Sequence, residues 1–192
     1  MNFAQAWQAG KLGESQIANW LRYHHGMHVF PAYEKQTRDY KGPTLFCAEG
    51  DSLILPDLPG IKGDHLYWVE AKHKSAFTFY RKTRSWQTGI DVRLYEQYQD
   101  VQKRTGIGVY LMFVQGEGRA KDAPSDGPSG LYAGSLSYLM QHEDHRDEFR
   151  NGAYMVFWNE CALRKIASLE ELHSVTKTRR QSQTEPFVSA HI

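Results

Sequence analysis

The sequence has few cysteines, no long apolar run and no excess of charge of one sign. Its two cysteines, Cys47 and Cys161, lie far apart and outside any metal-binding spacing, so neither a disulfide framework nor a thiolate zinc site is predicted. The first fifteen residues lack the apolar core of a signal peptide, and no run approaches the length of a membrane span. We therefore expect a cytoplasmic protein.

The charges are almost balanced, with 23 Lys and Arg against 22 Asp and Glu. A net charge of +1 produces no overall field that would attract a polyanion, so any binding of nucleic acid must depend on a local patch. The sequence also lacks internal repeats and low-complexity blocks. We expect one α/β domain over residues 1–174, followed by a polar, loosely ordered tail over 175–192.

Residues 53–74 contain the polar side chains that are the main candidates for a functional site. A strand is predicted over 65–70, because this run is rich in aromatic and β-branched residues and follows the turn-forming segment 59–64. Residues 53–55 are its expected hairpin partner. Since residues two apart in a strand share a face, Glu70 and Lys72 should project together, and Asp57 should lie beside Glu70.

Residues before and after this hairpin show helical and strand patterns. Apolar spacings of three and four predict a helix over 12–25, which places Glu14 in its first turn, where the helix dipole favours a carboxylate. We further expect, in chain order, a strand over 27–33, a loop over 34–52, a helix over 91–105, a strand over 107–114, a loop over 116–130, a helix over 135–141, a strand over 153–158 and a capped helix starting at Ser168. This order predicts a mixed sheet with helices packed on it.

Residues 71–90 form a basic patch without a single acidic residue. Its cations beyond Lys72 are Lys74, Arg81, Lys82 and Arg84, and aromatic residues lie between them. Such a segment can neutralise phosphates while its aromatic rings stack on unpaired bases. A solvated charged face without a ligand is the alternative.

Two neighbouring carboxylates at a strand end repel one another unless a cation lies between them or one is protonated. Mg²⁺ prefers oxygen ligands and keeps several waters, so Asp57, Glu70 and the main-chain carbonyl of Ala71 are candidate ligands. Lys72, on the face of Glu70, could stabilise negative charge in a transition state. The pattern therefore points to metal-assisted hydrolysis of a phosphate ester.

With Gly13-Glu14, Pro56-Asp57 and Glu70-Ala71-Lys72 in this order, the chain resembles the PD-(D/E)XK nuclease superfamily over residues 10–115. The resemblance implies a restriction-endonuclease-like α/β fold with a mixed central sheet flanked by helices. It also implies a Mg²⁺-dependent deoxyribonuclease, with Mn²⁺ as a substitute, DNA as the partner and a possible homodimer.

The resemblance also assigns roles within the site. It implies that Asp57 and Glu70 bind the metal, that Ala71 offers its carbonyl, that Lys72 assists the nucleophile and that Glu14 supports the site. The chain departs from RecB-like branches of the family, because Gln87 is followed four residues later by Asp91 rather than tyrosine.

Other interpretations of these residues remain open at this point. The chain could be a nucleic-acid-binding or assembly module of the same fold without catalysis. Asp57 could merely shape a turn, with Glu70 and Lys72 forming an exposed cross-strand pair. The histidines at 24, 25 and 28 and at 142 and 145 match no recognised ligand pattern, so we expect ordinary hydrogen-bonded histidines there.

Overall fold

The computed structural model describes residues 3–30, 34–36, 41–48, 50–118, 120, 123–148 and 152–174 of the 192-residue chain. Its helical elements are α1 (Phe3–His25), α2 (Val92–Thr105), α3 (Leu136–Gln141) and the 3-10 turn η1 (Glu160–Ala162). Its strands are β1 (His28–Val29), β2 (Glu34–Gln36), β3 (Lys41–Phe46), β4 (Ser52–Ile54), β5 (Leu58–Lys62), β6 (His65–Lys74), β7 (Thr78–Tyr80), β8 (Ser85–Asp91), β9 (Val109–Gln115), β10 (Gly130–Ser135), β11 (His145–Glu148), β12 (Tyr154–Asn159) and β13 (Arg164–Ala167).

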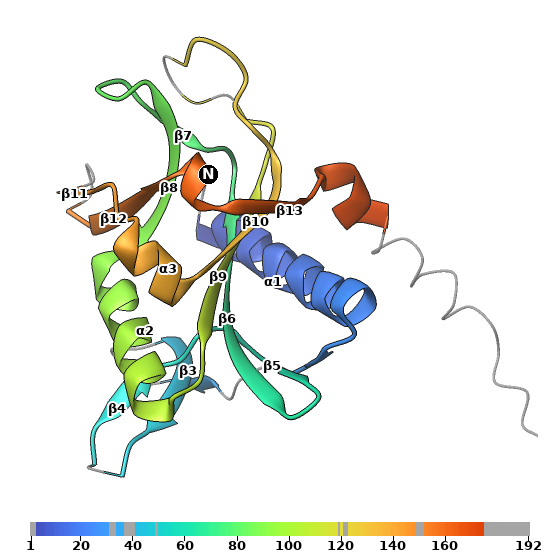
Figure 1. Cartoon of the computed structure of the whole chain (residues 1–192), viewed down its shortest axis with the longest axis vertical. Coiled ribbons are helices and arrows are strands. Elements are labelled where there is room, and N and C mark those ends of the chain that lie inside the picture. The colour runs from blue at the N-terminus through green and yellow to red at the C-terminus, as the bar shows by residue number, and fades with distance from the viewer. Residues whose placement is uncertain are drawn as a thin grey trace, which may run out of the picture.

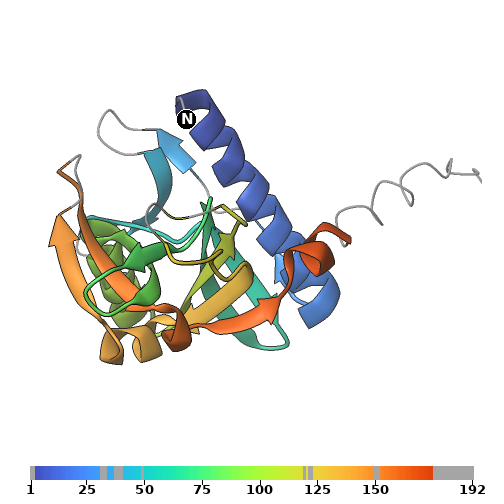
Figure 2. The same ribbon diagram turned by 90° about the horizontal axis from the view of Figure 1, so that it is seen from above.

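The strands form a mixed six-stranded sheet of order β1-β5-β6-β9-β10-β13 and two smaller sheets, β11-β12-β8-β7 and β2-β3-β4. Within the large sheet β6 and β9 are parallel, whereas the other neighbours are antiparallel. Helix α1 packs on one face of the large sheet and α2 lies on the other (Figures 1 and 2). The expected α/β architecture with a mixed central sheet is confirmed.

Strand alternation divides the core between the two faces of the sheet. On the α1 side, Val69 and Ala71 of β6 pack with Ile17 and Trp20 of the helix. On the α2 side, Trp68 belongs to a larger cluster that includes the buried tyrosines of α2. Strand β9 is buried except at Tyr110, and its sequence is almost wholly apolar, as expected for a central strand with a parallel neighbour.

Several predicted helix ends are confirmed by their capping contacts. The Asp91 carboxylate accepts from the Arg93 amide at the start of α2, and Gly106 ends that helix with a φ of 68°. Ser135 caps α3. Ser168 and Glu171 form the reciprocal capping box at the start of a last helical segment over 169–174.

The predicted start of the first helix was wrong. Helix α1 begins at Phe3 rather than at residue 12, because the alanine and glutamine residues that precede the amphipathic part have high helix propensity. Glu14 therefore lies in the middle of α1 and not in its first turn. The helix dipole does not explain a carboxylate at that position.

The predicted hairpin partner of β6 was also wrong. Strand β4 pairs with β3, and β5 pairs with β6. The error arose because Pro59 and Gly60 suggest a turn, yet both lie within β5. A Cβ at Gly60 would lie 2.7 Å from Cε of Met27, so glycine is needed here for close packing rather than for a turn.

Other boundaries differ from the prediction in smaller ways. The expected loop over 34–52 contains β2 and β3, and the strand expected over 27–33 is described only as β1, since residues 31–33 lie outside the described part. Strands β7, β8, β10, β11 and β13 were not predicted. The tail 175–192 also lies outside the described residues. In the described part, no helix has both the length and the apolar character that crossing a bilayer requires.

A close contact between α1 and β6 fixes the helix on the sheet. Gly13 is buried in the helix, and a Cβ at this position would lie 2.8 Å from Cβ of His73. The contact is so tight that any other residue would push the helix away from the strand. Gly10, one turn earlier in the same helix, has open space around it, because a Cβ there would meet no atom within 4 Å.

These two glycines predict opposite effects of the same substitution. Gly13→Ala should lower the free energy of unfolding by about 1–3 kcal/mol, because the added methyl group collides with a strand that cannot move away. Gly10→Ala should raise it by about 0.5–1 kcal/mol through helix propensity alone. Urea denaturation of both variants and the unmodified protein measures the difference, and equal effects at the two positions would contradict the proposed contact.

Candidate active site

The structure brings Asp57, Glu70 and Lys72 together on the central sheet. Glu70 and Lys72 project from the same face of β6, and Asp57 comes directly before β5. The register that pairs Leu58 with Val69 places Asp57 beside this part of β6. The main-chain N–H of Ala71 donates to Oδ2 of Asp57 at 3.2 Å, which fixes the carboxyl group next to Glu70.

Glu70 is the most buried charged residue of this group, with 0% of its surface exposed. The Lys72 ammonium forms an ion pair with Oε1 of Glu70. Neither carboxylate oxygen has a hydrogen bond of full geometry among the described residues. Tyr98 of α2 lies next to this carboxylate, and burial together with the Glu70 charge raises the pKa of Tyr98 well above its usual value.

The environment of Asp57 changes the pKa of its carboxyl group. Burial and, after it, the neighbouring Glu70 carboxylate raise the pKa of Asp57 from 3.8 to about 8, although Lys72 and the Ala71 amide act in the opposite direction. In the absence of a bound cation, the Asp57 carboxyl group is therefore protonated at neutral pH. A positive ion between two carboxyl groups held this close would stabilise both of them.

Lys72 keeps its charge in spite of its surroundings. Burial alone would lower its pKa, but the carboxylates of Glu70 and Asp57 outweigh that effect and raise the pKa above the usual value. The side chain is consequently an ammonium ion that faces both carboxyl groups. It can stabilise negative charge at this point, and it is not a free base at neutral pH.

Glu14 reaches the same group of residues from α1. Its carboxylate forms an ion pair with Lys11 at 3.0 Å, and its charge contributes to the raised pKa of Asp57 and of Lys72. The tight contact of the preceding Gly13 with His73 holds this turn of the helix on β6. The predicted fourth residue thus lies within electrostatic reach of Asp57 and Lys72.

The donor set fits a hard divalent cation. Asp57 and Glu70 supply carboxylate oxygens, and the Lys72 ammonium at Oε1 of Glu70 shows that this buried carboxylate already attracts a cation. In the described part of the chain, no cluster of three or more His, Cys, Asp or Glu side chains has the geometry of a metal site. The carbonyl of Ala71 as a further ligand stays a prediction.

The structure excludes one of the alternatives left open by the sequence. Glu70 is not part of an exposed cross-strand pair, because it is completely buried. The histidines have other contacts: His24 stacks on Trp20, the His142 ring contacts the carbonyl of Tyr138, and His145 bonds to Asp144. These contacts agree with ordinary hydrogen-bonded or packed histidines.

The predicted nucleic-acid-binding residues fall into two groups. Lys74 continues the face of Glu70 and Lys72 along β6, and burial together with the Lys72 charge lowers the pKa of Lys74 to about 8. Arg81, Lys82 and Arg84 are exposed in the turn between β7 and β8. Figure 1 shows that this hairpin extends from the end of the sheet where β6 ends.

Sequence reasoning missed several buried polar residues beside the site. Gln115 ends β9 in register with Lys74, is 0% exposed and donates to the Thr88 hydroxyl at 2.8 Å. Tyr98 was not selected because its helical spacing suggests core packing alone. A glutamine at the end of the apolar run 109–114 was the one available signal for Gln115, since buried glutamines need partners.

Three polar residues of β8 and α2 have structural roles. Gln87 is buried and donates to Asp144 at 2.8 Å, which joins β8 to the segment before β11. Asp91 caps α2, and the Tyr95 hydroxyl donates to Glu143.

The raised pKa of Asp57 predicts how stability depends on pH in metal-free protein. Between the unfolded pKa near 3.8 and the folded pKa of about 8, only the unfolded chain loses this proton, so stability falls as the pH rises. Asp57→Asn removes that loss. In EDTA, the variant should be more stable than the unmodified protein at pH 8, by roughly a few kcal/mol, and the difference should shrink toward pH 4.

Asp64→Asn in the exposed turn between β5 and β6 is the matched control for this measurement. It should leave the pH dependence of urea unfolding unchanged. Parallel curves for Asp57→Asn and Asp64→Asn from pH 4 to pH 8 would contradict the raised pKa of Asp57.

Comparison with known proteins gives likeness in structure and none in sequence. No protein-family model and no curated protein matches the chain. The chain is similar in structure to Hjc, a Holliday junction resolvase from the archaeal hyperthermophile Archaeoglobus fulgidus, with 10% sequence identity and a TM-score of 0.46 over 82% of this chain and 91% of that chain. It is also similar to a nuclease from a fusselovirus, with 14% identity and a TM-score of 0.40 over 96% of this chain and 98% of that chain.

Proposed function

We propose that this protein is a divalent-metal-dependent nuclease that hydrolyses phosphodiester bonds in DNA. The observation that carries the proposal is the pair of facing carboxyl groups, Asp57 and Glu70, with the Lys72 ammonium beside them. Each is positioned by the main chain of the central sheet, so the group does not depend on mobile side chains of a loop.

Mg²⁺, or Mn²⁺ in its place, would be held by Asp57 and Glu70, with the Ala71 carbonyl as a further donor. When bound, such an ion polarises the phosphorus centre and lowers the pKa of a coordinated water. In the metal-free protein, burial and then the charge of Glu70 raise the pKa of Asp57, and a cation held between the two carboxyl groups would oppose both effects.

Lys72 contributes a fixed positive charge in a partly buried place. The Lys72 ammonium would hold the attacking water or stabilise an oxygen of the phosphate that gains charge in the transition state. Electrostatic stabilisation of this kind is strongest where water is excluded. Glu14 faces the same region and can orient the attacking water through its carboxylate.

The basic residues provide a track for the nucleic acid. Lys74 lies next to Lys72 on β6, and the hairpin turn with Arg81, Lys82 and Arg84 lies beyond the end of that strand. A phosphate backbone that crosses the site can contact both groups. A homodimer would supply two such sites to the two strands of a duplex.

The catalytic residues predict a sharp loss of cleavage. Lys72→Ala and Asp57→Asn should each reduce the rate of plasmid and oligonucleotide cleavage in Mg²⁺ by about 100-fold or more, and EDTA should abolish it. Lys103→Ala, an exposed lysine in the last turn of α2, should have no effect. Undiminished cleavage by both site variants would sink the proposal.

A binding module without catalysis is the second candidate. It is favoured by the absence of any three-residue metal-ligand cluster within the described ranges and by the ion pair between Lys72 and Glu70. Salt-dependent DNA binding without any turnover in Mg²⁺ or Mn²⁺ would establish it.

The hairpin residues predict a change in the salt dependence of DNA binding. Replacing Arg81, Lys82 and Arg84 by glutamine removes three charges and keeps a polar side chain at each position. The slope of log K against log salt should become shallower by about 0.9 for each lost phosphate contact. Fluorescence anisotropy with catalytically blocked protein measures the slope, and Lys103→Gln serves as the single-charge control. An unchanged slope would show that this hairpin does not touch DNA.

A further inference from the structure

The sheet face opposite the candidate active site contains an open trough. Tyr67 and Val69 of β6 lie in its floor, and because successive residues of a strand point to opposite faces, Glu70 and Lys72 point away from it. The register carries this face across the sheet: Val69 pairs with Tyr110, Met112 with Ala133, and Ala133 with Arg164. The trough is therefore separate from the carboxylate site.

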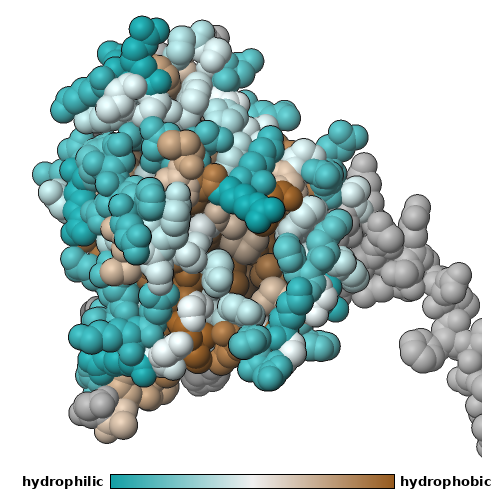
Figure 3. Space-filling model, in the orientation of Figure 1, coloured by the Kyte–Doolittle hydropathy of each residue, from teal (hydrophilic) through white to brown (hydrophobic). Residues whose placement is uncertain are grey.

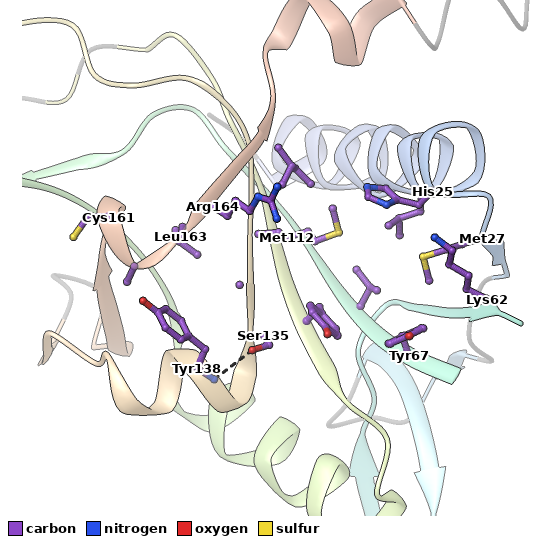
Figure 4. Close-up of a pocket in the computed structure, with 17 residues that line it drawn as sticks. His25, Met27, Lys62, Tyr67, Met112, Ser135, Tyr138, Cys161, Leu163 and Arg164 are labelled. Carbon is purple, nitrogen blue, oxygen red and sulfur yellow. Dashed lines mark hydrogen bonds between the residues drawn. The ribbon is translucent and has the colours of Figure 1, made fainter. Parts of the chain in front are cut away.

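The trough has a mostly apolar floor and two walls, and its volume is about 650 Å³. One wall comes from the C-terminal end of α1 and from Met27, and the other from α3, η1 and β13 (Figure 4). Figure 3 shows apolar surface in the middle of this face, surrounded by hydrophilic residues. A concave apolar site of this size is typical of sites for small organic ligands.

Three basic residues from distant parts of the chain line the same trough. They are His25 from the end of α1, Lys62 from the end of β5 and Arg164 from the start of β13. Figure 4 shows Arg164 and His25 coming from the two opposite walls. The mutual influence of these groups is seen in the pKa of His25, which burial, Lys62, His24 and Arg164 all lower.

The charges of Lys62 and Arg164 are not neutralised by the protein in the part of the chain that the structure describes, and His25, with its lowered pKa, adds a neutral ring nitrogen beside them. None of the seventeen lining residues is an aspartate or a glutamate. No described carboxylate forms an ion pair with His25, Lys62 or Arg164. Like charges that converge without a counter-charge repel one another and favour an anion between them.

We propose that this trough binds an organic anion with an apolar body, such as a carboxylate with an unbranched hydrocarbon chain. The anionic head would lie among His25, Lys62 and Arg164, and the apolar body would cover Val69, Met112 and their neighbours. The charge of the lining selects the sign of the head group, and the apolar floor selects the body. A nucleic acid would leave that floor exposed, because its charged backbone has no apolar surface to place there.

Isothermal titration calorimetry with decanoate tests the proposal on the full chain. Decyltrimethylammonium has the same hydrocarbon chain with a positive head, and acetate has the negative head without the chain. Decanoate should bind with one molecule per chain, and the two control compounds should not bind at the same concentrations. Equal binding of decanoate and decyltrimethylammonium, or no binding of decanoate, would overturn the proposal.

Two kinds of variant separate the head-group site from the floor. The double variant Lys62→Gln with Arg164→Gln should weaken decanoate binding at least tenfold. Lys165→Gln should not, because Lys165 is adjacent to Arg164 in sequence but lies on the other face, over the ring of Tyr132. Ala133→Phe fills the trough without a change of charge and should abolish binding. Decanoate affinity that is the same in all three variants would refute the site.

Other occupants give different results in the same set of proteins. Sedimentation velocity shows whether two chains associate and whether Ala133→Phe separates them; a dimer broken by this substitution would make a second copy the occupant and overturn the proposal. The nuclease assay on the double variant should be unchanged, because neither residue lies on the carboxylate face. Ligand binding in the trough and cleavage at the carboxylate site are thus tested by separate measurements.

Discussion

Burial of the Glu70 carboxylate in the middle of the sheet is the constraint on which the site depends. An ionised group without exposed surface costs several kcal/mol unless its surroundings compensate. Lys72 supplies the opposite charge, Tyr98 lies beside the oxygens, and Asp57 gives up its own charge by staying protonated. This arrangement is only a partial compensation, since both Glu70 oxygens lack good hydrogen bonds. The buried carboxylate would therefore be stabilised by further positive charge, and this is the main chemical property of the site.

The main chain, rather than flexible side chains, assembles these groups. The Ala71 amide holds Asp57, and the contact between Gly13 and His73 holds the helix that carries Glu14. Both contacts involve residues with little or no side chain, so the geometry tolerates few changes in volume. The same sheet then serves two surfaces, because the alternation of β6 directs Glu70 to one face and Val69 to the other.

Much of the site could be predicted from local sequence patterns, whereas the structure around it could not. A period of two predicts that Glu70 and Lys72 share a face, and turn and cap residues predict α2, α3 and the Ser168 capping box. The pairing of β5 with β6 could not be predicted from Pro59 and Gly60, because their role depends on the close approach of Met27. The convergence of His25, Lys62 and Arg164 depends on the register of five strands, which no local pattern encodes. The long extent of α1 was missed because the prediction used only the amphipathic spacing from residue 12 onward, whereas helix propensity extends the helix to Phe3.

The position of β6 within the large sheet also determines the order in which parts of the molecule open. Strand β6 is hydrogen-bonded on both sides, to β5 and β9, whereas β7 is an edge strand of a smaller sheet. Amide protons around Glu70 should therefore exchange with solvent only in the least frequent, most global openings, and those of the β7–β8 hairpin in frequent local ones. The β7–β8 hairpin can thus change its shape while the carboxylates keep their spacing. Within one continuous stretch of chain, the part around Glu70 is rigid and the hairpin that contains Arg84 opens more easily.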